Sequence, residues 1–167
     1  MTGRAGRLVA AGLAFAAGRA GAAAPAAESR YDREIDRAVA SASAVYPVPR
    51  ELVKAVIRAE SDFDARAVSR AGAVGLMQIL PSTGRRLGIP VADLADPARN
   101  VEGGVRLLAV LLRRYRGDVV SALVAYNARP RPRFAPIPRN GETPAYVRAV
   151  LSNLRRYARP APPGGSR

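Results

Sequence analysis

Residues 55–81 read AVIRAESDFDARAVSRAGAVGLMQILP, and an acidic side chain interrupts an apolar helical pattern in this stretch. Counting back from Glu60 at helical spacing gives Ile57, Val56 and Val53, which share one face of a helix. A carboxylate that continues such a face either ends the helix in water or enters a cleft. In a cleft, desolvation raises the pKa of the acid, so that it stays protonated near neutral pH. The surrounding sequence motifs are needed to distinguish a helix end in water from a carboxylate in a cleft.

The beginning of the chain has the order of a secretory signal peptide. Arg4 and Arg7 precede an uncharged, largely apolar run at residues 8–18, and small residues follow up to Ala27. The run is too short to cross a bilayer as a helix. The sequence therefore predicts an exported protein, periplasmic or secreted, without a transmembrane anchor in the mature chain.

The remaining length accommodates a single domain. The whole chain has 167 residues, of which 49% are hydrophobic, and this is enough to bury one core. We expect a signal peptide at residues 1–27, one domain at 28–159 and a disordered tail at 160–167.

Cysteine and histidine are both absent from the chain. The absence of cysteine excludes a disulfide framework and a thiolate nucleophile. The absence of histidine removes the commonest metal ligand and the usual base of a serine or cysteine triad. The sequence accordingly predicts no metal site and no cofactor, and it leaves carboxylate chemistry as the expected catalytic chemistry.

The net charge of +14 raises nucleic-acid binding as a competing hypothesis, because clustered basic side chains neutralise phosphates. However, Lys54 is the only lysine, and the arginines are scattered along the whole chain among many alanines. Compositional bias toward arginine and alanine produces the same pattern. We therefore predict no nucleic-acid partner, and expect the charge to favour an anionic polymer such as the cell wall.

Helical periodicity dominates the domain, and alternating strand patterns are hard to find. Expected helices span residues 31–45, 50–60, 97–115, 119–127 and 143–157, with a short helix opening at Pro81. Asp118 is the expected N-cap of helix 119–127. The segment RPRPRFAPIPRNG, residues 129–141, holds four prolines and is expected to be neither helix nor central strand. The predicted fold class is all-α.

Four short motifs follow one another in this domain. They are Glu60-Ser61, Gly75-Leu76-Met77-Gln78, Ala125-Tyr126-Asn127, and Glu142-Thr143 followed by Tyr146-Val147. In this order and spacing they closely resemble the lytic transglycosylases of the soluble, lysozyme-like type, over roughly residues 45–157. The resemblance implies an all-α, lysozyme-like domain and an enzyme that acts on peptidoglycan glycan strands.

The resemblance also implies a mechanism in which Glu60 is the sole catalytic acid and base. As an acid it protonates the leaving oxygen of the MurNAc–GlcNAc β-1,4 bond, while the N-acetyl group of the sugar helps to stabilise the oxocarbenium-like centre. As a base it then takes the proton of the C6 hydroxyl, which attacks C1. The implied product is a 1,6-anhydro-N-acetylmuramyl end, formed without water.

The resemblance assigns substrate contacts to six further residues, namely Met77, Gln78, Tyr126, Asn127, Glu142 and Tyr146. Simpler interpretations exist for several of them. Met77 at an apolar position is more often a core residue, and Tyr126 is compatible with a buried tyrosine whose hydroxyl is satisfied. The family pattern instead aims the Tyr126 hydroxyl at Glu60 or the sugar. Glu142 and Tyr146 share a helix side if the helix begins that early, although Glu142 is also a favourable N-terminal helix charge.

Other functions stay open at this stage. Asp62 or Asp64 as a second carboxylate predicts a muramidase-type hydrolase, although aspartates at such positions most often cap or form turns. A non-catalytic peptidoglycan-binding module is a further alternative. Arg129 stands where the family usually has glycine, so the geometry of that loop is an uncertain part of the resemblance. A secretion or envelope machinery is a conceivable partner by analogy only.

Overall fold

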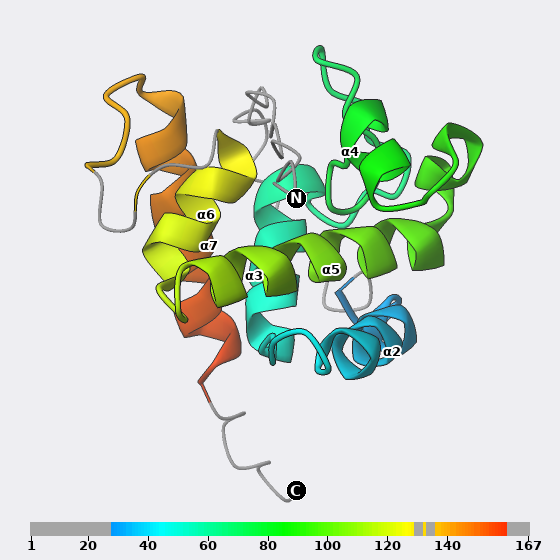
Figure 1. Ribbon diagram of the computed structural model, residues 1–167, viewed down its shortest axis with the longest axis horizontal. Helices are drawn as coiled ribbons and strands as arrows, with labels where there is room; N and C mark the ends of the chain where they lie inside the picture. The colour runs from blue at the N-terminus through cyan, green and yellow to red at the C-terminus, as the bar shows by residue number, and fades with distance from the viewer. Residues whose placement is uncertain (1–27, 129–131, 133–135, 160–167) are drawn as a thin grey trace, which may run out of the picture.

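The computed structural model describes residues 28–128, 132 and 136–159, and these residues form a helical domain (Figure 1). The elements are α2 (Asp32–Ala42), α3 (Arg50–Ser61), α4 (Pro81–Arg86), the 3-10 helix η1 (Val91–Ala95), α5 (Pro97–Arg114), α6 (Val119–Asn127) and α7 (Glu142–Tyr157). Within the described ranges, β-structure is limited to isolated bridges that join Val74 to Val68 and to Ile79. The all-α prediction is confirmed.

The expected helices agree with the observed ones except near their ends. The first helix stops at Ala42, three residues before its predicted end, because the chain turns there and Pro47 follows. The last helix begins at Glu142 and includes Thr143, so Glu142 and Tyr146 are one turn apart on the same helix. The 3-10 helix η1 was not predicted, because five residues are too few for a periodic pattern.

Asp118 caps α6 as predicted from the sequence. Its carboxylate accepts hydrogen bonds from the backbone nitrogens of Val120 and Ser121, at 3.1 and 3.3 Å. Gly117, with a φ of 80°, makes the corner between α5 and α6. The corner therefore brings α6 back against α5, and these two helices contact one another.

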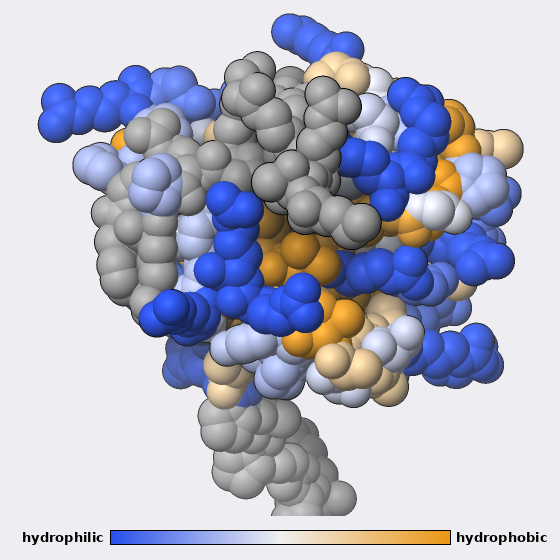
Figure 2. Space-filling view, in the orientation of Figure 1, coloured by the Kyte–Doolittle hydropathy of each residue, from blue (hydrophilic) through white to orange (hydrophobic). Residues whose placement is uncertain are grey.

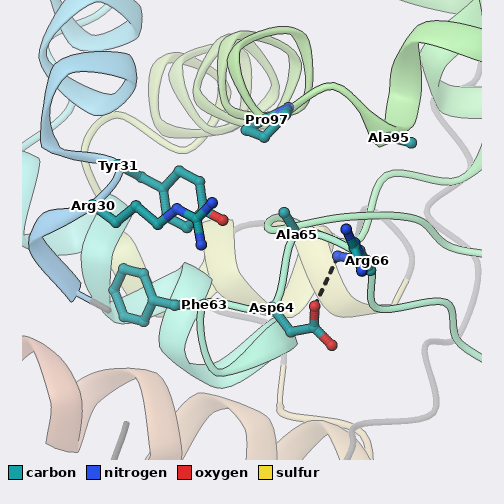
Figure 3. A pocket seen from close by; sticks show the side chains of 8 residues that line it. All are labelled: Arg30, Tyr31, Phe63, Asp64, Ala65, Arg66, Ala95 and Pro97. Atoms are coloured by element: carbon teal, nitrogen blue, oxygen red, sulfur yellow. Dashed lines mark hydrogen bonds between the residues drawn. The ribbon is translucent and has the colours of Figure 1, made fainter. Parts of the chain in front are cut away.

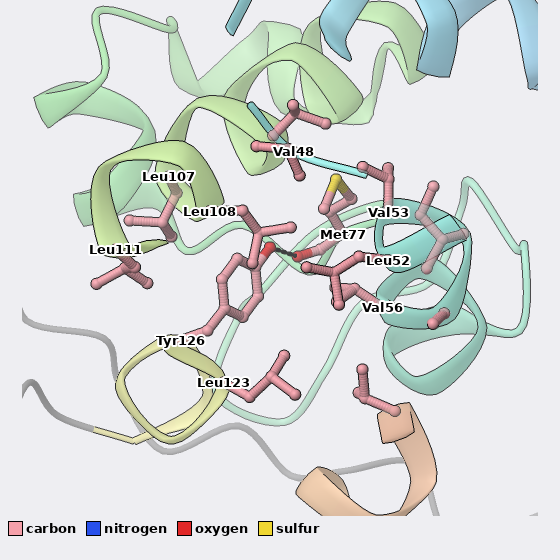
Figure 4. Packing of buried hydrophobic residues seen from close by; sticks show 14 of the residues in the cluster. Val48, Leu52, Val53, Val56, Met77, Leu107, Leu108, Leu111, Leu123 and Tyr126 are labelled. Atoms are coloured by element: carbon pink, nitrogen blue, oxygen red, sulfur yellow. Dashed lines mark hydrogen bonds between the residues drawn. The ribbon is translucent and has the colours of Figure 1, made fainter. Parts of the chain in front are cut away.

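The core lies between two principal helix pairs, α3 with α7 and α2 with α5. The apolar face of α3 is buried throughout, and Val53, Val56 and Ile57 have no exposed surface. Side chains from α3, α5 and α6 meet around Met77 in the middle of the domain (Figure 4). Burial of this face gives α3 a fixed position, which determines where its last turn and Glu60 lie.

Hydrophilic side chains project from the face shown in Figure 2, around a group of hydrophobic atoms at its centre. Large hydrophobic residues exposed in the described part of the chain are Val68, Val91 and Val120. None of the helices in that part is long and apolar enough to span a membrane. The predicted signal peptide at 1–27, the tail at 160–167 and the loop position Arg129 lie outside the described residues.

Candidate active site

Glu60 lies in the last turn of α3, where the chain leaves the helix sharply. The residues that follow, Asp62 and Phe63, have positive φ values of 51° and 64°. Asp62 forms an ion pair with Arg58, whose Nε lies 3.0 Å from Asp62 Oδ1. The Glu60 side chain is only 5% exposed. Its Oε1 atom is buried and has no hydrogen-bond partner among the described residues.

The environment of Glu60 favours its protonated form. Burial is the main cause, and it raises the pKa of this carboxyl group from its ordinary value to about 8. The Tyr146 hydroxyl works in the opposite direction and lowers this pKa, whereas the nearby charge of Glu142 raises it. Glu60 is therefore protonated at neutral pH, as a general acid has to be.

The first turn of α7 contributes two side chains to the surroundings of Glu60. Glu142 and Tyr146 face the same way because they are four residues apart on this helix. Both Glu142 Oε1 and Tyr146 Oη are buried without a hydrogen-bond partner in the described structure. Burial and the charge of Glu60 raise the pKa of Tyr146 well above its ordinary value, so its hydroxyl keeps its proton.

Tyr126 and Asn127, at the end of α6, are two further residues of the predicted site. The Tyr126 hydroxyl donates a hydrogen bond to the backbone oxygen of Met77 at 2.8 Å (Figure 4). The proton of this hydroxyl is therefore engaged by the Met77 loop, and the expected contact of Tyr126 with Glu60 or the sugar stays a prediction. The charge of Glu60 still contributes, after burial, to raising the pKa of Tyr126. Asn127 keeps both side-chain polar atoms buried without a partner among the described residues.

The loop that contains Met77 and Gln78 is shaped by contacts within the protein. Gln78 has a φ of 48°, and its Nε2 donates to the backbone oxygens of Gly75 and Ala67 at 2.9 and 3.1 Å. The Met77 side chain is fully buried and packs against Gly104, where a Cβ atom would overlap it. Met77 is thus a core residue, the simpler of its two sequence interpretations. Its predicted contact with substrate stays a prediction that this burial does not favour.

Asn100 holds this loop and was missed by the sequence reasoning. It is fully buried on α5, and its Oδ1 accepts a hydrogen bond from the backbone nitrogen of Met77 at 2.8 Å. Its Nδ2 donates to the backbone oxygens of Val74 and Leu94, both at 2.8 Å. Gly75 has a φ of 79°, and a Cβ atom there would meet the Asn100 amide. The glycine is therefore needed for this close approach.

The glutamate and the loop are joined directly by the residue that follows Glu60. The hydroxyl of Ser61 donates a hydrogen bond to the backbone oxygen of Leu76 at 2.8 Å. The Glu60-Ser61 motif therefore combines the candidate acid with the side chain that attaches α3 to the loop. The four sequence motifs converge on one cluster, although several of their side chains serve to position others.

The two aspartates considered as a second catalytic carboxylate have structural contacts instead. Asp62 is paired with Arg58. Asp64 is exposed, and its Oδ1 accepts a hydrogen bond from the backbone nitrogen of Arg66 at 2.8 Å. This contact is an Asx turn, which is the role expected for an aspartate in a loop.

Comparisons with known proteins agree with this geometry. The family model described as the transglycosylase SLT domain matches residues 37–144. The chain is 44% identical over 89 residues to the transglycosylase of Enterobacteria phage PRD1, which covers 53% of this chain and 32% of the relative. It is 36% identical over 105 residues to a membrane-bound lytic murein transglycosylase C of Sodalis glossinidius, covering 53% of this chain and 29% of that protein. The chain thus spans about a third of the length of these curated relatives.

Two solved structures show the same fold. One is a lytic transglycosylase Slt from Pseudomonas aeruginosa, described as an inactive mutant, with a TM-score of 0.64 and 27% sequence identity. The other is the 70 kDa soluble lytic transglycosylase of Escherichia coli, with a TM-score of 0.64 and 24% identity. Each comparison covers 77% of this chain and 24% of the other. The predicted lysozyme-like, all-α fold class is confirmed.

Proposed function

This chain belongs to the transglycosylase SLT domain family, and from this premise we propose that it is a peptidoglycan lytic transglycosylase. The reaction is cleavage of the MurNAc–GlcNAc β-1,4 bond with formation of a 1,6-anhydroMurNAc end. The observation that carries the proposal is the Glu60 carboxyl group, which is buried, lacks a partner on Oε1 and has a pKa of about 8. Such a group is protonated when substrate arrives at neutral pH.

Glu60 acts in both steps of the proposed reaction. In the first step it donates its proton to the glycosidic oxygen, so that the C1–O bond breaks and the N-acetyl oxygen of the sugar stabilises the positive charge at C1. In the second step the carboxylate takes the proton of the C6 hydroxyl, and the C6 oxygen forms a bond to C1. Glu60 is then protonated again, and no water is consumed.

The neighbouring side chains serve this cycle by controlling the proton on Glu60. Glu142 disfavours the carboxylate form of Glu60 and so keeps this acid protonated before the first step. Tyr146 stabilises the carboxylate that exists between the two steps. Asn127, Glu142 and Tyr146 carry buried polar atoms without partners in the described structure, which supports them as groups for sugar hydroxyl or acetamido contacts. For Gln78 the proposed contact is restricted, because its amide nitrogen already donates to two loop carbonyls.

The proposed substrate and location are those of the cell envelope. The Sodalis relative is described as a membrane-bound lytic murein transglycosylase, which supports peptidoglycan as the substrate and action outside the cytoplasm. We propose export through a signal peptide at residues 1–27, because basic residues, an apolar run and small residues follow one another there. A secretion machinery as partner has no support in the comparisons and is not proposed.

A hydrolase is the second candidate, because one observation favours it. The charge of Glu142 reaches Glu60, so the site contains a second carboxylate in addition to the candidate acid. A carboxylate pair at a suitable separation activates water in inverting glycosidases. In that case the product has a reducing end, and Glu142 is the base.

Product analysis separates the two candidates. The purified protein is incubated with peptidoglycan, and the released muropeptides are compared by mass spectrometry with those of lysozyme. A lytic transglycosylase yields products lighter by one water, since the C6 hydroxyl closes the reaction. As a control, Asp62→Asn and Asp64→Asn should retain activity, because both side chains have structural contacts. Products that all carry reducing ends would overturn the transglycosylase proposal in favour of the hydrolase.

A further inference from the structure

A pocket of about 550 Å³ lies beside the loop that follows α3 (Figure 3). It is lined by Arg30, Tyr31, Phe63, Asp64, Ala65, Arg66, Ala95 and Pro97. None of these residues belongs to the predicted catalytic or substrate-binding set. The loop that forms one wall of the pocket begins at Phe63, three residues after Glu60.

Five of the eight residues that line the pocket have aromatic or small apolar side chains. Tyr31 and Phe63 supply two aromatic side chains, which are 8% and 5% exposed. The remaining apolar lining comes from two alanines and Pro97. Small side chains against aromatic rings leave room for methyl groups and an extended backbone. The volume is within the range that accommodates a small peptide end.

Two arginines give the rim of this pocket its charge. The Arg30 guanidinium lies over the Tyr31 ring, 5.6 Å from its centroid, and this contact keeps the group beside the pocket. Neither Arg30 nor Arg66 forms an ion pair with any residue that the structure describes. Asp64 is the single acidic residue in the lining, and its Oδ1 is engaged by the Arg66 backbone nitrogen. The rim therefore has a surplus of positive charge and free guanidinium donors, which suit a carboxylate.

We propose that this pocket binds the free, alanine-type carboxyl end of a peptide carried on the glycan strand. The arginines recognise the terminal carboxylate, and the aromatic and small residues receive the methyl-bearing side chains. This inference rests on the proposed function, because peptidoglycan is the polymer that carries such peptides. It adds a peptide-recognition site to a glycan-cleaving site and makes the loop after α3 a wall of both.

Binding is tested on the intact protein by NMR titration of its backbone amides. The probe is D-alanyl-D-alanine, and the controls are its C-terminal amide and acetate. We expect the acid to shift resonances of the pocket residues and to bind at least about tenfold more tightly than either control, since only the acid supplies both the charge and the methyl groups. Equal affinity for the amide, equal affinity for acetate, or shifts confined to other regions would overturn the proposal.

A double variant tests the role of the arginines. Arg30→Ala/Arg66→Ala should weaken binding of D-alanyl-D-alanine at least about tenfold. Arg33→Ala/Arg70→Ala is the matched control, because it removes the same charge from two exposed arginines outside the pocket lining. Thermal unfolding checks that both variants remain folded. Equal binding by the two double variants would show that net charge alone is responsible, and would overturn the proposal.

An activity measurement connects the pocket to the reaction. On peptide-bearing glycan strands the Arg30→Ala/Arg66→Ala variant should have a higher KM with an unchanged kcat, whereas on strands stripped of peptide it should match the parent. An equal loss on both substrates would contradict peptide recognition. If the parent cleaves neither substrate, the proposed function fails, while the dipeptide titration still decides the pocket proposal on its own.

Discussion

Glu28 and Glu60 are both buried glutamates that lie against α3, but they have opposite surroundings. Glu28 is 8% exposed, and its Oε1 lies 2.9 Å from an Arg58 nitrogen and 3.1 Å from an Arg156 nitrogen. Glu60 is 5% exposed, has no partner on Oε1 and has the charge of Glu142 nearby. Two guanidinium groups surround the Glu28 carboxylate, whereas burial without such a partner raises the pKa of Glu60 and keeps it protonated. This difference indicates a structural role for Glu28 and a catalytic role for Glu60.

The two glutamates receive side chains from opposite ends of α7. The first turn of α7 places Glu142 and Tyr146 near Glu60, whereas its last turn places Arg156 on Glu28. Arg58 is in turn only two residues before Glu60 on α3. The Glu28 cluster therefore fixes α7 against α3, and this fixed position delivers the side chains that tune Glu60.

The largest expected effect is on activity. Glu60→Gln keeps the shape of the side chain but removes the transferable proton, so we expect a loss of at least about a hundredfold in the rate of muropeptide release. Glu28→Gln should retain most of the activity of the parent, provided that the assay temperature lies below its unfolding transition. Circular dichroism checks folding of both variants. An active Glu60→Gln protein would contradict the proposed mechanism.

The second effect is on stability, and here Glu28 is the sensitive residue. Glu28→Gln removes the carboxylate that joins Arg156 to the largely buried Arg58 side chain, which keeps only its pair with Asp62, so we expect the free energy of unfolding to fall by about 2 kcal/mol. Urea denaturation at neutral pH measures this loss. Glu102→Gln is the control, because its exposed pair with Arg106 should contribute less than about 0.5 kcal/mol. If both variants lost the same free energy of unfolding, the buried Glu28 pairs would be no more stabilising than the exposed Glu102–Arg106 pair.

The third effect concerns the pH dependence of stability. The folded pKa of Glu60, about 8, exceeds its ordinary value of 4.5, so the folded state binds this proton more tightly than the unfolded state. Its contribution is fully present below pH 4.5 and is lost as the pH rises toward 8. Glu60→Gln has no such loss. We expect the variant to gain about 1 to 2 kcal/mol over the parent between pH 6.5 and pH 8 in urea denaturation, and a constant difference would contradict a protonated Glu60.

The sequence predicted the helices and the candidate acid because both depend on local patterns. Helical periodicity located α3 and α5, and the interrupted apolar face identified Glu60. The motif resemblance brought Tyr126, Glu142 and Tyr146 into the same site, and the pKa relationships between these residues and Glu60 agree with that grouping.

The features that were missed depend on contacts between distant parts of the chain. Glu28 is 30 residues from Arg58 and 128 from Arg156, and no periodic pattern relates these positions. Asn100 is 23 residues from Met77, so no local pattern relates the two. One signal was available, because Asn100 is a polar residue on the apolar face of α5, four positions before the buried Gly104. The direction of the Tyr126 hydroxyl depends on the path of the loop that contains Met77, because the hydroxyl donates to a backbone oxygen of that loop. The short sequence of the loop does not specify this path.

The smallest expected effect is a pair of opposite shifts in the pH–rate profile. The charge of Glu142 raises the pKa of Glu60, so Glu142→Gln should lower that pKa and move the alkaline limb of activity to lower pH. The Tyr146 hydroxyl lowers the same pKa, so Tyr146→Phe should move the limb to higher pH. Each shift should be a fraction of a pH unit, because burial is the main cause of the raised pKa and remains in both variants. Rates of muropeptide release between pH 5 and 10 measure both shifts. If Glu142→Gln abolishes activity at every pH instead of moving the limb, Glu142 takes part in the chemistry and the hydrolase mechanism replaces the one proposed.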